Sequence, residues 1–314
     1  MSYISQNQPR VFLAMMTWMM GHGHLRESIQ SILDQSYDDF TLLIYDDLSP
    51  EDPSDIINDF LASDKRLKYI RNKSRLGMCA ASSFVLNEAP EDTSYFAWVS
   101  DHDLYHKDWL KENIKKLHEN KFAIISYPLV SGIDSRGQIN ERQPTYYEND
   151  SMNVYRRISS FANLEAGAGN IIWGVFRYEA LIKIGGWPKL IVPDVILILR
   201  LCLFGSIVQI NKILHIRREQ NERSEYSGSM ISRQLRAIYP NKRPLYSYIN
   251  YKIINAIYLL FVEALGSLFG RKFLPSFYLT YMYTYVSLKF FVIGLPRRLI
   301  NNRLTRILSN WIFK

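Results

Sequence analysis

The feature of this sequence that most constrains its fold is a regular alternation of short apolar runs with helical patterns across its first 126 residues. The apolar runs suit strands that are buried on both faces of a sheet. The stretches between them carry apolar residues at helical spacing, as in 25–33. The five predicted strands are residues 11–16, 40–45, 67–70, 95–99 and 122–126. This order predicts an α/β domain with a mostly parallel, doubly wound sheet flanked by helices.

Beyond these elements the pattern is less regular. Residues 127–150 are polar, and we expect loops there. A strand, a glycine-containing turn and an apolar helix are predicted at 171–176, 185–188 and 195–203. In a sheet of this kind ligands bind beyond the carboxyl ends of the strands. The residues that follow each predicted strand are therefore the first candidates for a functional site.

The charge of the chain is distributed unevenly. The net charge is +8, but residues 226–314 hold 13 Lys or Arg and one acid, which gives +12 and leaves −4 for the other 225 residues. A uniformly basic nucleic-acid-binding protein would not show this division, so we expect no nucleic-acid partner. We place a boundary where the acids end, between a catalytic domain at 1–225 and a basic, aromatic-rich, helical segment at 226–314.

The C-terminal segment indicates contact with a membrane. Two apolar stretches, 253–270 and 273–295, approach the length of a membrane span. Two spans would leave Arg271 and Lys272 as the whole translocated loop, which is too short and too basic, so we favour interfacial helices over two spans within 253–295. Residues 300–311 form a basic amphipathic pattern that suits an anionic membrane surface. The alternative for this last helix is packing on the catalytic domain or a dimer contact.

The cysteines and the start of the chain bear on its location. Cys79 and Cys202 show neither metal-ligand spacing nor a disulfide pattern, so we expect two small buried side chains in a reducing compartment. No basic stretch followed by an apolar run opens the sequence, as a secretory signal would. We therefore expect a cytoplasmic protein that is peripheral on the cytoplasmic face of the membrane.

Acidic residues follow two of the predicted strands. Asp101 and Asp103 come one residue apart after a buried strand, where paired carboxylates suit a divalent cation that also holds a diphosphate. The alternative is a solvated turn that caps the next helix. After the second strand, Asp47 could accept a hydrogen bond from a nucleotide base or a ribose, or Asp46 and Asp47 could form a turn and a helix cap.

A third acid, Asp194, stands at the head of the predicted apolar helix, directly after Pro193. A carboxylate on a rigid helix end can serve as a general base. An acid at this position is also a common helix cap, because the helix dipole favours negative charge there.

Taken together, these acids lie in the order and spacing of a known family. The chain resembles the family 2 glycosyltransferases, which are inverting enzymes of the GT-A fold, over roughly residues 10–226. The segments that carry the resemblance are 12–17 with 25–37, 38–49, 100–103 with 108–110, 184–187, and Asp194 with 199–201. Three stretches depart from the family pattern: 16–19, 75–77 and Pro193 with Asp194.

The resemblance implies a role for each matching residue. Asp47 would contact the base, Asp101 the ribose or the metal, and Asp103 a divalent cation, Mn²⁺ or Mg²⁺. Asp194 would be the catalytic base. Thr17 and Arg75, which follow the first and third strands, complete the expected nucleotide site.

We therefore expect an inverting, hexosyltransferase-like enzyme. It would move a sugar from a nucleotide-diphosphate sugar, a UDP-sugar above all, to a hydroxyl of a glycan or lipid-linked acceptor. His215, Arg217 and Arg218 could reach the diphosphate, or they could form an exposed basic turn. The alternatives are a nucleotidyltransferase and a noncatalytic homologue that binds a nucleotide sugar.

Overall fold

The structure is a computed structural model that describes residues 9–18, 23–133, 138–140, 147–162, 170–218, 230–241, 251–260 and 273–293. Its centre is a nine-stranded sheet with the strand order β3-β2-β1-β4-β8-β6-β9-β5, and β7 pairs with β6. The strands are β1 (Val11–Thr17), β2 (Phe40–Asp46), β3 (Leu67–Arg71), β4 (Tyr95–Val99), β5 (Leu104–Tyr105), β6 (Ala123–Ile133), β7 (Ile139–Asn140), β8 (Val175–Arg177) and β9 (Ser206–Arg218).

Parallel and antiparallel pairs divide this sheet into two parts. Strands β3, β2, β1 and β4 run parallel to one another, which confirms the predicted core of the domain. Strand β8 lies antiparallel between β4 and β6, and β9 runs parallel to β6. The short β5 is antiparallel to the end of β9, so the loop that follows β4 lies beside the end of β9.

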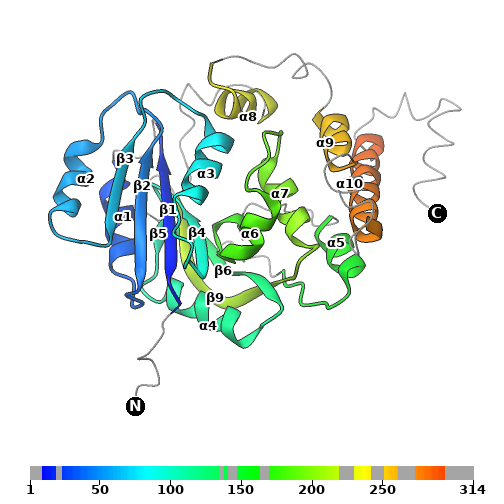
Figure 1. The fold of residues 1–314 in the computed structure, drawn as a ribbon, viewed down its shortest axis with the longest axis horizontal. Coiled ribbons are helices and arrows are strands. Elements are labelled where there is room, and N and C mark those ends of the chain that lie inside the picture. The colour runs from blue at the N-terminus through cyan, green and yellow to red at the C-terminus, as the bar shows by residue number, and fades with distance from the viewer. Residues whose placement is uncertain are drawn as a thin grey trace, which may run out of the picture.

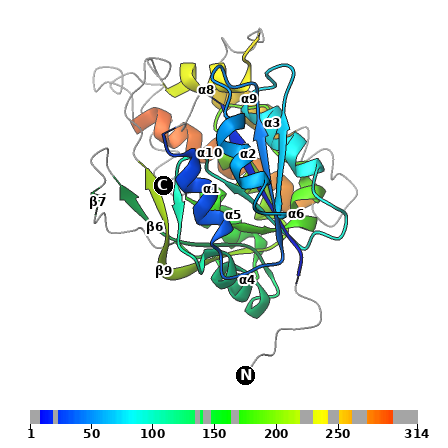
Figure 2. The same cartoon turned by 90° about the vertical axis from the view of Figure 1, so that its left-hand side faces the viewer.

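Helices cover both faces of the sheet (Figure 1). One face packs against α1 (Leu25–Leu33), α2 (Ser54–Leu61) and α4 (Trp109–Glu119). The other face packs against α3 (Met78–Asn87), α5 (Val154–Ala162), α6 (Tyr178–Ile184) and α7 (Pro193–Leu201). Figure 2 shows α1 and α2 in front of the sheet, with α10 behind it.

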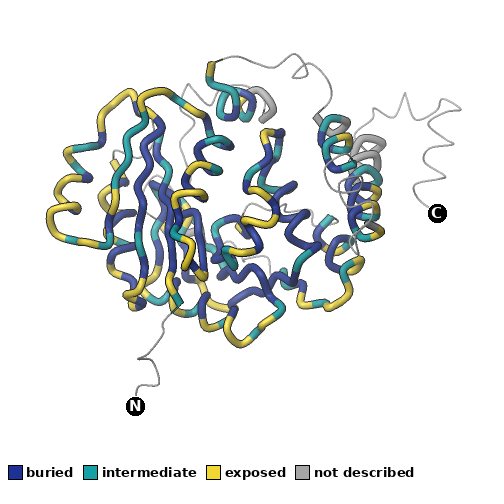
Figure 3. Tube along the Cα trace, viewed as in Figure 1, coloured by how far each residue is buried: buried dark blue, intermediate teal, exposed yellow. Residues whose placement is uncertain are grey.

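This two-sided cover follows from the apolar runs. Side chains alternate between the faces of a strand, so every second residue of β1 joins each of the two cores. Both faces of β1, β2 and β4 are therefore buried, as the dark strands of Figure 3 show, whereas the edge strand β3 is only partly buried. The apolar interior ends at the carboxyl edge of these strands, where buried polar residues begin.

The described part of the C-terminal segment packs on the catalytic domain. It comprises α8 (Met230–Ile238), α9 (Tyr251–Leu259) and α10 (Phe273–Ile293). Leu259, Leu279 and Met282 are buried in the core that α5 and α7 share. In the described part of the chain no helix is both long enough and apolar enough to cross a membrane. The amphipathic helix predicted at 300–311 lies outside the described residues.

Two expected elements differ from the structure. The predicted loop at 127–150 begins with the second half of β6, which pairs with β9 as far as Ile133. The predicted strand at 171–176 is instead a 3₁₀ turn, Ile171–Trp173, followed by β8. The turn buries Ile171 and Ile172, and a short buried apolar run looks the same in sequence whether it is extended or helical.

Candidate active site

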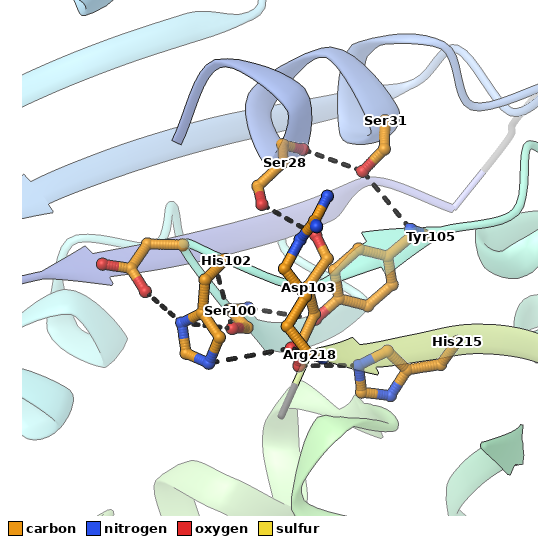
Figure 4. Close-up of polar contacts among 9 residues, drawn as sticks. Ser28, Ser31, Ser100, His102, Asp103, Tyr105, His215 and Arg218 are labelled. Atoms are coloured by element: carbon orange, nitrogen blue, oxygen red, sulfur yellow. Dashed lines mark hydrogen bonds and ion pairs between the residues drawn. The ribbon is translucent and has the colours of Figure 1, made fainter. Parts of the chain in front are cut away.

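The acidic pair after β4 lies where two distant parts of the sheet meet. Because β5 follows the pair at once and places Tyr105 opposite His215 of β9, the loop between β4 and β5 lies against the end of β9. Asp103 is 1% exposed, and its Oδ2 lies 2.9 Å from Nε2 of His215. The backbone N–H of Arg218 donates to Asp103 Oδ1 at 2.9 Å (Figure 4).

These contacts set the ionisation of Asp103. Burial opposes the charged form, but the hydrogen bond from His215 and the other polar contacts outweigh it and lower the pKa of the Asp103 carboxyl below its usual value. The backbone is also fixed, because the Ser28 hydroxyl of α1 donates to the Asp103 carbonyl at 2.7 Å. Asp103 is therefore held as a carboxylate in one place.

The position of His215 is fixed by Tyr105. The two rings stack with centroids 4.8 Å apart and an angle of 4° between their planes. The Tyr105 hydroxyl accepts from the backbone N–H of Ser100 at 3.0 Å, so Tyr105 spans the loop that carries both acids. His215 Nδ1 is buried and has no hydrogen-bond partner among the described residues, so Nε2 is the ring nitrogen that donates to the Asp103 carboxylate.

His102 lies between the two carboxylates. Its Nδ1 is 2.7 Å from Asp101 Oδ1, and its Nε2 is 3.7 Å from Asp103 Oδ1. Burial alone would lower the pKa of His102, but the hydrogen bond and charge of Asp101, with the charge of Asp103, raise it overall. In the sequence His102 reads as a spacer between two acids, so the contact with both could be found only in the structure.

The donor set at this place fits the expected divalent cation. Asp101 and Asp103 offer carboxylate oxygens, the donors that Mg²⁺ and Mn²⁺ prefer. Among the residues that the structure describes, no three or more His, Cys, Asp or Glu side chains form a group that could hold a metal ion. Asp101 and Asp103 would hold such a cation together with phosphate oxygens and water, which commonly complete the coordination of Mg²⁺.

The other predicted nucleotide residues gather at the ends of β1 to β3. Both oxygens of Asp47 accept hydrogen bonds from the loop after β3, at 2.7 Å from the Leu76 N–H and at 2.8 Å from the Gly77 N–H. Thr17 is buried beside Asp46, and its carbonyl accepts from the Asp47 N–H at 3.0 Å. Asp47 thus shapes the loop, and a contact of Asp47 with a base stays a prediction.

An aromatic residue that the sequence argument did not single out lies beside Arg75. The guanidinium carbon of Arg75 is 3.1 Å from the ring centroid of Trp18, directly after β1. A cation over an indole face is a favourable contact. The signal in the sequence was a tryptophan at the exit of the first strand, next to Thr17.

Asp194 lies on a different element from the acidic pair, helix α7. Helix α7 begins at Pro193, and Asp194 is its second residue. Val192, directly before the helix, has a left-handed conformation with φ of 53°. Burial raises the pKa of the Asp194 carboxyl, and backbone N–H groups in its own turn only partly offset this. Burial raises the pKa of the Cys79 thiol on α3 to about 12, and the charge of Asp194 adds to this shift.

Comparison with known proteins gives this arrangement its context. The model of glycosyl transferase family 2 matches residues 23–178, which include α1, the acidic pair and most of the sheet. This part of the chain belongs to glycosyl transferase family 2. An uncharacterized glycosyltransferase of Methanocaldococcus jannaschii is 27% identical over 151 residues, or 48% of this chain and 51% of that protein. One from Rickettsia felis is 32% identical over 115 residues, or 37% of this chain and 18% of that protein.

The match with those two relatives spans about half of their length or less. Among solved structures, S. aureus TarS 1–349 in complex with UDP-GlcNAc superposes with a TM-score of 0.61 and 12% sequence identity, covering 92% of this chain and 77% of that one. At this level of identity the likeness concerns the fold, and it confirms the expected GT-A architecture.

Proposed function

We propose that this family 2 glycosyltransferase transfers a hexosyl unit from a UDP-sugar to a hydroxyl of a glycan or lipid-linked acceptor, with inversion at the anomeric carbon. The observation that carries the proposal is the buried carboxylate of Asp103, held ionised by His215 and the Arg218 N–H at the carboxyl edge of the sheet. Fixed anionic groups at that edge suit a cation and the diphosphate it neutralises.

The donor end of the reaction is assigned to the ends of β1 to β4. TarS, which shares the fold, has been solved with UDP-GlcNAc and with UDP. We place the nucleotide of this chain beside Thr17, Asp47 and Arg75, and its diphosphate beside Asp101 and Asp103. A divalent cation bound there would act as a Lewis acid on the leaving diphosphate. Asp101 and Asp103 hold it, and His215 keeps Asp103 in place.

The acceptor end is assigned to Asp194. Its raised pKa brings the carboxylate nearer to the working pH of a cell, which suits a proton acceptor. Asp194 would take the proton of the acceptor hydroxyl while that oxygen attacks the anomeric carbon opposite the leaving diphosphate. One displacement of this kind inverts the configuration.

The test is a panel of sugar nucleotides that includes UDP-GlcNAc, UDP-glucose, UDP-galactose and GDP-mannose. Release of the nucleoside diphosphate and thermal stabilisation are measured with and without Mn²⁺ or Mg²⁺. We expect turnover of a UDP-sugar and a requirement for the cation. Binding without turnover in the presence of varied acceptors would favour a noncatalytic homologue, and release of pyrophosphate from UTP and a sugar phosphate would favour a nucleotidyltransferase.

We propose in addition that the C-terminal segment contacts an anionic membrane surface on its cytoplasmic face, where a lipid-linked acceptor would lie. Its charge of +12 supports this. So does an outward face of α10 with Leu274, Phe277 and Tyr281 exposed to 66%, 53% and 51%, at spacing i, i+3 and i+7. Exposed aromatic residues near basic sequence suit the interfacial region of a bilayer.

Vesicle co-sedimentation tests this contact. The double variant Phe277→Ser/Tyr281→Ser should bind vesicles of phosphatidylglycerol and phosphatidylcholine more weakly than the parent at low and at high salt. Ile213→Ser on β9, which removes a side chain that is also 50% exposed, is the matched control. Equal binding of the double variant and the parent would contradict the assignment of this face.

A further inference from the structure

Helix α8 and the three residues after it connect the two ends of the proposed reaction. Figure 1 shows α8 above α3 and above the loop that leads into α7. Its side chains Leu235 and Ile238 are buried in a small apolar cluster with Cys79 of α3 and Ile191 of the loop before α7. Three segments that are far apart in sequence therefore share one cluster, separate from the two main cores.

On the acceptor side, α8 holds the residues that precede Asp194. The backbone N–H of Val192 donates to the side-chain Oε1 of Gln234 at 2.6 Å. The Tyr239 hydroxyl donates to the carbonyl of Lys189 at 2.6 Å. Val192 has a positive φ, which is a strained conformation for a β-branched residue and persists only where the surroundings enforce it. The acceptor oxygen of Gln234 is one of the contacts that enforce it.

On the donor side, the same segment rests on the loop that Asp47 shapes. Gly77 has φ of 84°, and a Cβ at this position would lie 2.7 Å from Pro240 Cδ and 2.8 Å from the Ala237 carbonyl oxygen. Only a glycine allows so close an approach. Asn241 adds a hydrogen bond to the Arg75 carbonyl at 3.4 Å. Residues 230–241 therefore pack against both the loop before α7 and the loop after β3.

We infer that Gln234 is a positioning residue for Asp194: by accepting the Val192 N–H, it fixes the first turn of α7 and so the place of the carboxylate. This inference rests on the proposed function, because it concerns the side chain assigned there as general base. Without the acceptor, the Val192 N–H loses its partner, and the left-handed turn two residues before Asp194 can relax. A displacement of about 1 Å at a reacting group can cost 10²-fold in rate.

A double-mutant cycle in the full chain tests the inference. Gln234→Leu keeps the size of the side chain and removes the acceptor, and Gln234→Glu keeps the acceptor. Arg233→Ala, which truncates an exposed neighbour on α8, is the control. Each is measured with the UDP-sugar of the panel that turns over fastest. We expect Gln234→Leu to lower kcat by about 10- to 100-fold with an unchanged KM for the donor. Gln234→Glu should restore most of the rate, and the control should match the parent.

The cycle is completed in an Asp194→Asn background. If Gln234 acts through Asp194, Gln234→Leu should have little further effect there, because the two losses are not additive. An unchanged kcat of Gln234→Leu in the parent would overturn the inference and leave the proposed function standing. An equal loss in both backgrounds, or a loss of donor affinity with the rate, would overturn it as well. Parental turnover of Asp194→Asn alone would instead overturn the proposed base, and the role of Gln234 with it.

Discussion

The surroundings of Asp103 and those of Asp194 shift the pKa of a carboxyl group in opposite directions. Asp103 faces His215 and the Arg218 N–H, and these contacts lower its pKa despite burial. Asp194 meets backbone N–H groups of its own helix turn, and burial raises its pKa. Groups whose environments push their pKa values apart commonly have different roles in one reaction. Here the contrast separates a carboxyl group held in its charged form from one whose pKa is shifted toward binding a proton.

The largest expected effect is on turnover at the acceptor side. Asp194→Asn keeps the shape of the side chain but removes the proton acceptor, so kcat should fall by about 10² to 10⁴. Affinity for UDP with Mn²⁺ should remain, because the base acts on the acceptor. The measurements are steady-state kinetics and calorimetric titration with UDP. Asp55→Asn, in the exposed first turn of α2, is the matched control. Near-parental turnover of the Asp194 variant would move the base elsewhere.

The next effect is on binding at the donor side. Asp103→Asn removes the charge that the cation and His215 both face, so the affinity for UDP in the presence of Mn²⁺ should fall about 10- to 100-fold or more, the scale of losses around metal sites. Thermal stability should fall as well, since His215 loses a charged partner in a buried place. The comparison becomes sharper if calorimetry shows that Asp103→Asn loses binding of UDP and Asp194→Asn retains it. Intact Mn²⁺-dependent binding would contradict the metal assignment.

The parallel half of the sheet could be predicted from the sequence because its signals are local. The runs at 11–16 and 95–99 are continuously apolar, and those at 40–45 and 67–70 are each interrupted once, with helical patterns between them. Strands that are mostly apolar on both faces leave little choice of arrangement. Polar residues directly after strands also led us to predict a site at the carboxyl edge of the sheet. Residues Asp47, Asp101 and Asp103 all lie there, at the carboxyl ends of β2 and β4.

The contacts that set the chemistry could not be predicted, because they join distant segments. His215 meets Asp103 across 112 residues of sequence, through the pairing of β5 with β9. The two-residue β5 carries no periodic signal of its own. The contact of α8 with Gly77 likewise depends on how distant segments pack in the fold. The sequence of α8 alone indicated only a basic segment. A glycine after the third strand was the one local sign of a close approach.

The smallest expected effect is on thermal stability. It tests the comparison through the direction in which Tm changes when Asp194 is substituted. The folded pKa of Asp194 is raised, so the folded state binds its proton more tightly than the unfolded state does. At pH values above the raised pKa the protein carries the full cost of a buried charge, and that cost disappears as the pH falls through the raised pKa toward the usual value of 3.8. Asp194→Asn should therefore raise Tm at pH 8 by a few degrees, the response that about 1 kcal/mol produces in a domain of this size.

This gain should shrink as the pH is lowered, because the parent then protonates Asp194 and loses its penalty. Asp55→Asn should behave in the opposite way at pH 8, with a slightly lower Tm, since an exposed acid in a first helical turn is favourable by about 0.3–1 kcal/mol. Thermal melts of both variants and the parent from pH 8 down to about pH 4, close to the usual pKa of an aspartic acid, measure the two signs. A lower Tm for Asp194→Asn across that range would mean that its carboxylate is stabilised in the fold, and the contrast with Asp103 would then be lost.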